Sequence, residues 1–245
     1  MNKGLLCTRV NVKRVDDDKK LIALELFRGL AKSYDRTVDF ATLFQDRFWK
    51  NWMGQWTQAR EGEMVLDIGC GTLLFEERMA SRGYSFVGLD LTEKMVRIGN
   101  SKGLPGVRLL VNGDAENLPF SDESFSSVIS CYVAKYVDLE KFAEEIARVT
   151  KPGAMAILYD FVRPRGPLAP FLELYVRGGM GAVGALLGLA RKDAAFTFSN
   201  IPGIVDDSTW DSRIAPIMDS KGFRTLDLRR LTGGIVCAYA GAKRA

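Results

Sequence analysis

The sequence predicts an α/β fold in which helices flank a mostly parallel sheet. Between residues 63 and 163, short apolar runs with the length of buried strands alternate with helix-length amphipathic segments. The first run, Met64–Leu66, passes through Gly69 and Gly71 into a helical pattern. A strand, a glycine turn and a helix in this order are typical of a doubly wound, Rossmann-like sheet.

Length and composition narrow the class of protein. The chain has 245 residues, enough for one large α/β domain, and its net charge of +4 is too small to indicate a nucleic-acid partner. Its four cysteines are scattered, which predicts reduced thiols in a cytoplasmic protein and no metal site. We expect no signal peptide and no membrane-spanning stretch, because the opening is charged and no run of eighteen apolar residues occurs. Histidine is absent, so any proton transfer must use a carboxylate, Tyr, Lys, Cys or water.

The first 60 residues are predicted to form a helical cap. We expect an irregular arm over residues 1–15 and a helix from about Lys19, capped by Asp16–Asp18. A second helix is expected over Phe40–Ala59. Its aromatic residues recur every four positions and are expected to pack against the remaining domain, residues 61–245. These residues are Phe44, Phe48, Trp52 and Trp56.

Carboxylates stand at the ends of successive strands. The first strand carries Asp67, the strand Tyr84–Asp90 ends in Asp90, and Val107–Val111 is followed by Asp114. Each acid alone would serve to cap the next turn. Because the carboxyl ends of parallel strands meet at one edge of a sheet, all three together favour a ligand crevice beside the glycine turn.

The residues favour S-adenosyl-L-methionine (SAM) over a dinucleotide as the cofactor. The dinucleotide fingerprint requires a third glycine where this chain has Leu74. A pyrophosphate beside three carboxylates would be repelled, whereas SAM carries a positive sulfonium, an amine and no phosphate. Asp90 is placed to accept hydrogen bonds from both ribose hydroxyls, and Thr72 to cap the helix after the turn.

The remaining elements follow in order. Strands are expected over Ser124–Cys131 and Ala154–Val162, helices over Asp138–Thr150 and Ser208–Ser220, and a closing hairpin over Phe223–Arg230 and Ile235–Ala240. Prolines interrupt the alternation after residue 163, and Phe171–Ala190 is apolar and rich in glycine. We expect residues 164–206 to form a helical insertion that covers the acceptor pocket and touches the membrane surface. An ordinary core helix with a linker is the alternative.

Four segments resemble the motifs of class I SAM-dependent methyltransferases. They are Val65–Thr72, Gly88–Asp90, Gly113–Phe120 and Lys151–Gly153. The resemblance implies a class I sheet with an antiparallel carboxyl-terminal hairpin, SAM as cofactor, and a set of cofactor-binding residues. That set is Asp67, Gly69, Cys70, Gly71, Thr72, Asp90, Leu91, Asp114, Ala115 and Ser130. Leu73 departs from the family, which usually has a third glycine there.

Both flanks also resemble the ubiquinone and menaquinone biosynthesis C-methyltransferases. Tyr34–Asp39 with Arg47–Lys50 is similar to their amino-terminal signature, and Leu231–Val236 to their last strand motif. Two departures lie near the expected acceptor. Gln45–Arg47 stands where the family usually reads Leu-His-Arg, and Cys131–Tyr136 where it reads Phe-Gly-Leu-Arg-Asn-Val.

This resemblance implies C-methylation of a demethylated menaquinol or ubiquinol precursor, which is a prenylated quinol. An O- or N-methyltransferase of another small molecule, or a SAM-binding protein without catalysis, remains open, as does a homodimer. Tyr34, or a water held by Asp35, is the candidate for assisting loss of the phenolic proton; alternatively Tyr34 closes over the adenosine as a lid. Lys135 is the candidate to replace the lost arginine; alternatively it is solvated at a helix entry.

Overall fold

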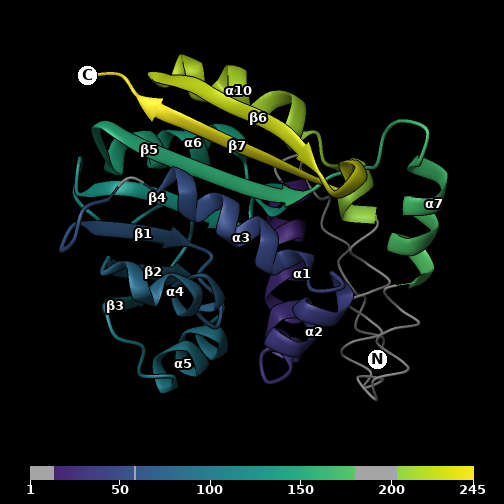
Figure 1. The fold of residues 1–245 in the computed structure, drawn as a ribbon, viewed down its shortest axis with the longest axis horizontal. Coiled ribbons are helices and arrows are strands. Elements are labelled where there is room, and N and C mark those ends of the chain that lie inside the picture. The colour runs from purple at the N-terminus through teal and green to yellow at the C-terminus, as the bar shows by residue number, and fades with distance from the viewer. Residues whose placement is uncertain (1–13, 58, 180–202) are drawn as a thin grey trace, which may run out of the picture.

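A central sheet of seven strands organises the part of the chain described by the computed structural model, which comprises residues 14–57, 59–179 and 203–245 (Figure 1). The strands are β1 Met64–Ile68, β2 Ser85–Asp90, β3 Val107–Asn112, β4 Phe125–Cys131, β5 Thr150–Phe161, β6 Phe223–Leu231 and β7 Val236–Lys243. Their order is β3-β2-β1-β4-β5-β7-β6, and only β7 runs antiparallel to its neighbours. The predicted α/β fold with a carboxyl-terminal hairpin is therefore confirmed.

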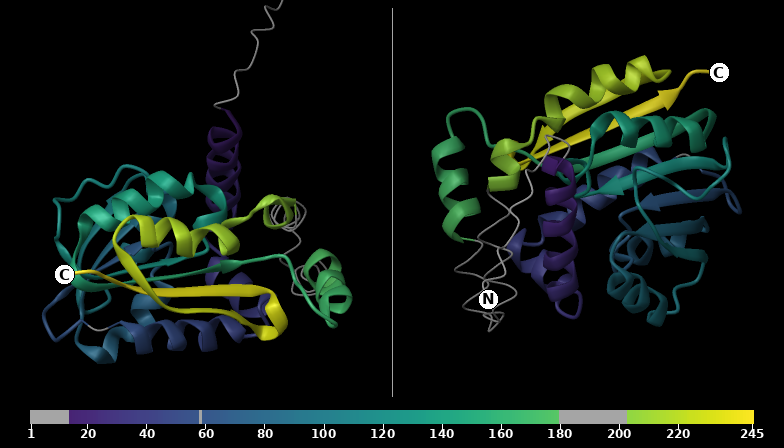
Figure 2. Two further views of the ribbon diagram at one scale, coloured as in Figure 1. Left: turned by 90° about the horizontal axis from the view of Figure 1, so that it is seen from above. Right: turned by 180° about the vertical axis from the view of Figure 1, so that it is seen from behind.

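Helices cover both faces of this sheet, as the view from above shows (Figure 2). The α-helices with described bounds are α1 Arg14–Leu30, α2 Tyr34–Ala41, α3 Gln45–Trp56, α4 Leu74–Met79, α5 Glu93–Ser101, α6 Leu139–Val149, α7 Ala169–Leu174 and α10 Trp210–Ser220, of which α7 stands apart from the sheet. On one face α6 and α10 bury Phe142 and Ile214 against the strands. On the other face α3 and α4 bury Trp49, Met53 and Phe75. The division into domains at residue 61 stays a prediction, although α3 shares a core with the sheet.

The amino-terminal helices differ from the expectation. Helix α1 begins at Arg14 and not at about Lys19, so the predicted cap Asp16–Asp18 falls inside the helix. The single helix expected over Phe40–Ala59 is wrong, because α2 and α3 are separate. Leu43 and Phe44 both adopt positive φ, and the Thr42 hydroxyl donates to the carbonyl of Val38 at 2.7 Å.

This break changes which aromatic side chains are buried. Phe44 and Phe48 are 46% and 60% exposed, whereas Trp52 is buried. The expectation that the whole stripe packs against the domain is therefore wrong for its first half. Trp49, outside the stripe, is fully buried, and its indole N–H donates to the Thr232 hydroxyl at 2.9 Å.

The second half of the chain departs from the prediction mainly at element ends. Strand β5 begins at Thr150 instead of Ala154, with an irregular register against β4 between Phe125 and Ser127. The predicted insertion contains α7 and a π-helical turn, Tyr175–Gly179, and most of its remainder lies outside the described residues. Among the described helices, none is long and apolar enough to cross a membrane.

Candidate cofactor and acceptor site

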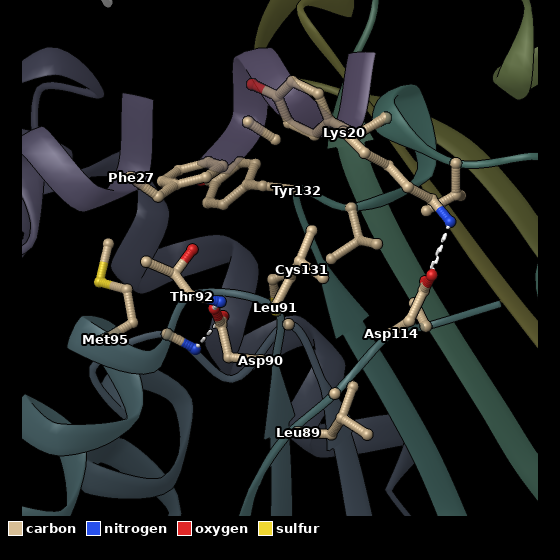
Figure 3. Close-up of a pocket in the computed structure, with 18 of the residues that line it drawn as sticks. Lys20, Phe27, Leu89, Asp90, Leu91, Thr92, Met95, Asp114, Cys131 and Tyr132 are labelled. Atoms are coloured by element: carbon tan, nitrogen blue, oxygen red, sulfur yellow. Dashed lines mark hydrogen bonds and ion pairs between the residues drawn. The ribbon is translucent and has the colours of Figure 1, made fainter. Parts of the chain in front are cut away.

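A cleft lies at the carboxyl ends of β1 to β4, as ligand sites of parallel sheets do (Figure 3). Parallel sheets bind ligands where the strand order reverses, and here that point lies between β1 and β4. The cleft is lined by Lys20, Ala23, Phe27, Tyr34, Gly69, Gly71, Leu89–Thr92, Met95, Gly113–Ala115, Cys131–Val133, Tyr136 and Val137. Seven of the twelve predicted site residues are in this lining; the five that are not are Asp67, Cys70, Thr72, Ser130 and Lys135, and all five are buried.

The glycine turn is fixed to the end of β2 by Asp90. The backbone N–H of Gly71 donates to one carboxylate oxygen of Asp90 at 2.9 Å, and that of Thr92 donates to the other at 2.7 Å. Burial raises the pKa of Asp90, although these hydrogen bonds oppose the rise. Asp90 therefore stands at the cleft with its orientation set, as a group that binds a diol requires.

The turn itself depends on close packing. Gly69 and Gly71 have φ of +79° and +55°, and a Cβ on Gly69 would lie 2.2 Å from a methyl carbon of Val133. Leu73 also adopts a positive φ, +67°, a strained conformation for a leucine. Its side chain packs against Gly99 of α5, where a Cβ would lie 2.8 Å from the Leu73 Cγ. Leu73 stands where a third glycine is usual, and its side chain fits because the neighbouring helix has a glycine, Gly99, at the point of contact.

At the other end of the cleft, helix α1 is tied to the β3 edge. The Lys20 ammonium lies 2.8 Å from carboxylate oxygens of both Asp114 and Glu116, as Figure 3 shows for Asp114. Burial lowers the pKa of Lys20, but the hydrogen bonds to these two acids outweigh it and raise the pKa overall. Asp114 thus lies at the cleft as predicted, with a lysine from the helical cap as its partner.

Asp67 is placed differently from the prediction of three acids facing one crevice. It is buried behind the turn, next to Glu76 of α4, and does not line the cleft. Burial raises the pKa of Asp67 to about 7 and that of Glu76 well above its usual value. Burial is the main cause for both carboxyls, and the negative charge of Asp67 adds to it for Glu76.

Three other predicted cofactor residues hold the turn from behind. Cys70 is buried, and a Cβ on Gly88 would lie 2.7 Å from its sulfur. The Thr72 hydroxyl donates to Asp35, and the helix cap expected there is wrong, because Leu73 is the residue that precedes α4. The Ser130 hydroxyl donates to the carbonyl of Ile68 at 2.7 Å. Direct contact of these residues with a cofactor stays a prediction.

Tyr34 lies over the glycine turn, with a ring carbon 3.7 Å from the position of a Cβ on Gly71. Burial, followed by the negative charge of Asp46, raises the pKa of Tyr34 well above its usual value. Its phenol therefore stays protonated at neutral pH and is a poor base. Asp35 is occupied by the Thr72 hydroxyl and by the Lys102 ammonium at 2.8 Å. The lid interpretation of Tyr34 is thus favoured over the proton-transfer one.

Lys135 is not the solvated residue of the alternative interpretation. It is 3% exposed, and its ammonium lies 2.5 Å from a carboxylate oxygen of Asp160. It also donates to the carbonyl of Tyr132 at 2.9 Å. Because its charge is neutralised by Asp160, Lys135 does not present a free cation to an acceptor.

The sequence interpretation missed a buried polar network beside the cleft. One carboxylate oxygen of Asp46 accepts from the Lys50 ammonium at 2.5 Å and from the hydroxyls of Tyr132 and Tyr159, each at 2.8 Å. Tyr132 lines the cleft with φ of +65°, and its ring stacks on Phe161 with centroids 5.0 Å apart. The four-residue spacing of Asp46 and Lys50 on one helix is the only local signal of this network.

The donor set of the cleft fits SAM. Carboxylates stand where hydroxyl and amine groups of the cofactor need acceptors, and the Lys20 ammonium, the cation among the lining residues, is already paired with two acids. A phosphate would meet the oriented carboxylate of Asp90 instead of free backbone N–H groups. These features agree with the prediction from the sequence that the cofactor is SAM and not a dinucleotide.

Comparison with known proteins extends over almost the whole chain. The model of the ubiE/COQ5 methyltransferase family matches residues 13–243. A protein of Mycobacterium sp. (strain KMS) named demethylmenaquinone methyltransferase is 32% identical over 221 residues, which are 89% of this chain and 92% of that protein. The protein of the same name from Tropheryma whipplei (strain Twist) is 28% identical over 219 residues, which are 88% of this chain and 89% of that protein. A SAM-dependent methyltransferase structure from Aquifex aeolicus shares the fold, with a TM-score of 0.55 at 18% identity over 79% of this chain and 88% of that one.

Proposed function

Because this chain belongs to the ubiE/COQ5 methyltransferase family, we propose that it methylates a ring carbon of a demethylated menaquinol. It is a SAM-dependent methyltransferase. The observation that carries the choice of acceptor is the similarity, over nearly the full length, to proteins named demethylmenaquinone methyltransferase. The cleft supports the choice, because Phe27, Tyr34 and Tyr136 give it an aromatic wall that suits a flat ring.

The residues of the chain act mainly by binding and by excluding water. When bound, SAM supplies a methyl group on a positively charged sulfur. Asp90 would hold the ribose, and Asp114 would accept from the adenine amine beside Lys20. Tyr34 and helix α1 close the cleft over the glycine turn. Holding an acceptor in line within a dry cleft is the chief source of rate for such a transfer.

The proposed reaction requires an electron-rich ring, which gives a direct test. We expect the demethylated acceptor to be methylated as the quinol and not as the quinone. The quinone has no phenolic proton to lose, and its ring carbon is a poor nucleophile. Mass spectrometry of the product after anaerobic incubation with SAM measures this. Equal turnover of oxidised and reduced acceptor, or none with any quinol, would favour another small-molecule acceptor instead.

We further propose that α7 and the turn between α2 and α3 contact the membrane in which a prenylated quinol resides. Leu168, Phe171 and Leu174 are 58%, 73% and 71% exposed. The Tyr175 hydroxyl donates to the carbonyl of Ala41 at 2.5 Å, which places this apolar surface beside the turn. Leu43 and Phe44 are exposed there as well. Exposed arginines flank the surface, as expected near anionic headgroups; they are Arg47, Arg163 and Arg165.

Flotation with anionic liposomes tests this surface. We expect the wild type to float with the lipid and the variant Phe171→Asp/Leu174→Asp to remain in the soluble fraction, because two buried apolar contacts with lipid are replaced by charges. Leu226→Asp/Leu228→Asp is a matched control, since these leucines of β6 are 37% and 42% exposed and lie outside the proposed surface. If the wild type itself stays soluble, the membrane contact is wrong.

A further inference from the structure

Tyr136 carries a buried hydroxyl that has no hydrogen-bond partner in the part of the chain that the structure describes. The residue ends the short helix η2, Ala134–Tyr136, is 4% exposed and lines the cleft. Leaving a buried hydroxyl unpaired is destabilising, so proteins rarely keep one without a reason. A polar group of this kind at a binding cleft indicates a ligand atom that pairs with it.

The surroundings of Tyr136 keep its proton in place. Burial, and then the negative charge of Asp160, raise the pKa of Tyr136 far above its usual value. The Lys135 ammonium lies 4.5 Å from the centre of the Tyr136 ring and pairs with Asp160. The phenol is therefore protonated at neutral pH, where it is a hydrogen-bond donor and not a base.

The position of Tyr136 assigns it to the acceptor and not to the cofactor. Asp90 and Asp114 stand at the ends of β2 and β3, on one side of β1 in the sheet. Tyr136 follows β4 on the other side of β1, and its neighbour Lys135 contacts Asp160 near the end of β5. Its ring meets Phe27 edge to face, with centroids 5.8 Å apart, so the ring belongs to the aromatic wall proposed to hold the acceptor ring.

We propose that the Tyr136 hydroxyl donates a hydrogen bond to a ring oxygen of the quinol and stabilises the negative charge that this oxygen gains as its proton leaves to water. No bond of Tyr136 forms or breaks; its hydrogen bond strengthens as charge develops on the oxygen. Fixed donors aimed at a developing oxyanion are among the largest contributions to enzymatic rate. This inference rests on the proposed function and names a contact residue for its acceptor.

Tyr136→Phe tests the proposal. We expect kcat/KM for the reduced acceptor to fall about 10- to 150-fold, which is the effect of losing a hydrogen bond to a charged group. The Kd for SAM should be unchanged. The melting temperature should stay equal or rise, because an unpaired buried hydroxyl is removed. Tyr239→Phe is the matched control: its hydroxyl is also buried, but Tyr239 lies in β7 and does not line the cleft. This control should retain wild-type kcat/KM.

The outcomes separate this inference from the proposed function. Wild-type kcat/KM in Tyr136→Phe overturns the role of Tyr136 while leaving quinol methylation intact. An equal loss in both tyrosine variants, or a lower melting temperature with weakened SAM binding, also overturns it, because the effect would then be structural. A wild-type enzyme that methylates no quinol overturns the proposed function and this inference with it.

Discussion

Replacing Asp46 with alanine is expected to lower the free energy of unfolding by about 3–5 kcal/mol, because removing one partner of a buried ion pair leaves the other charge uncompensated. Lys50 is 3% exposed and would lose its carboxylate, and the hydroxyls of Tyr132 and Tyr159 would lose their acceptor. Urea denaturation of the wild type and the variant measures the difference. Because Tyr132 lines the cleft, we also expect weaker turnover in the variant.

A surface pair provides the control for this prediction. Glu93 and Arg97 form an ion pair on α5 in which both side chains are largely exposed, 65% and 76%. Exposed pairs with this helical spacing contribute only about 0.3–0.5 kcal/mol, so Glu93→Ala should unfold almost like the wild type. A loss in Asp46→Ala no larger than that in Glu93→Ala would show that the buried network does not stabilise the fold.

Asp90→Ala is expected to weaken SAM binding about 10- to 150-fold, the equivalent of roughly 1.5–3 kcal/mol for hydrogen bonds to a charged group. The carboxylate is oriented by backbone N–H groups from the glycine turn and from Thr92, so its loss removes a preformed acceptor for the ribose. Titration calorimetry measures the affinity.

Two comparisons make this result specific. Asp122 has a 74% exposed side chain and is absent from the cleft lining, so Asp122→Ala should bind SAM like the wild type. NAD should show no binding to any variant, because the third dinucleotide glycine is missing. Calorimetry in which NAD binds and SAM does not would contradict the assignment of the cofactor.

The sequence was most informative where function depends on neighbouring residues. The strand, the glycine turn and Asp90 lie within 27 residues, from Met64 to Asp90, and local chemistry predicted their place in the fold. Leu73 was recognised as a departure. The contact that makes room for Leu73 was not predicted, because Gly99 meets Leu73 only after α5 has packed against the turn.

Asp67 shows how strand geometry decides which acids face a ligand. Its neighbours Leu66 and Ile68 point into the core formed with α6 and α10, and successive side chains of a strand point to opposite faces. Asp67 therefore points toward α4, where Glu76 lies, whereas Asp90 is the last residue of its strand and reaches the edge. The prediction grouped the acids by order along the chain and did not weigh this alternation.

Features that depend on distant residues could not be read from the sequence. Tyr132 and Tyr159 lie 86 and 113 residues from Asp46, and only the folded sheet brings them together. The break between α2 and α3 likewise lacks a signal, because Thr42–Phe44 contains neither glycine nor proline. Contacts of Phe44 with Phe40 and Arg47 accompany its unusual backbone conformation, but they form only once the chain has turned there.

The most direct test of the account is the position of the transferred methyl group. The enzyme would be incubated anaerobically with reduced demethylmenaquinol and SAM labelled with ¹³C in its methyl group, and the product examined by NMR. We predict that the label is bonded to a ring carbon, with both ring oxygens free. A label on oxygen, or transfer to a nitrogen-containing acceptor in preference to the quinol, would contradict C-methylation of a quinol.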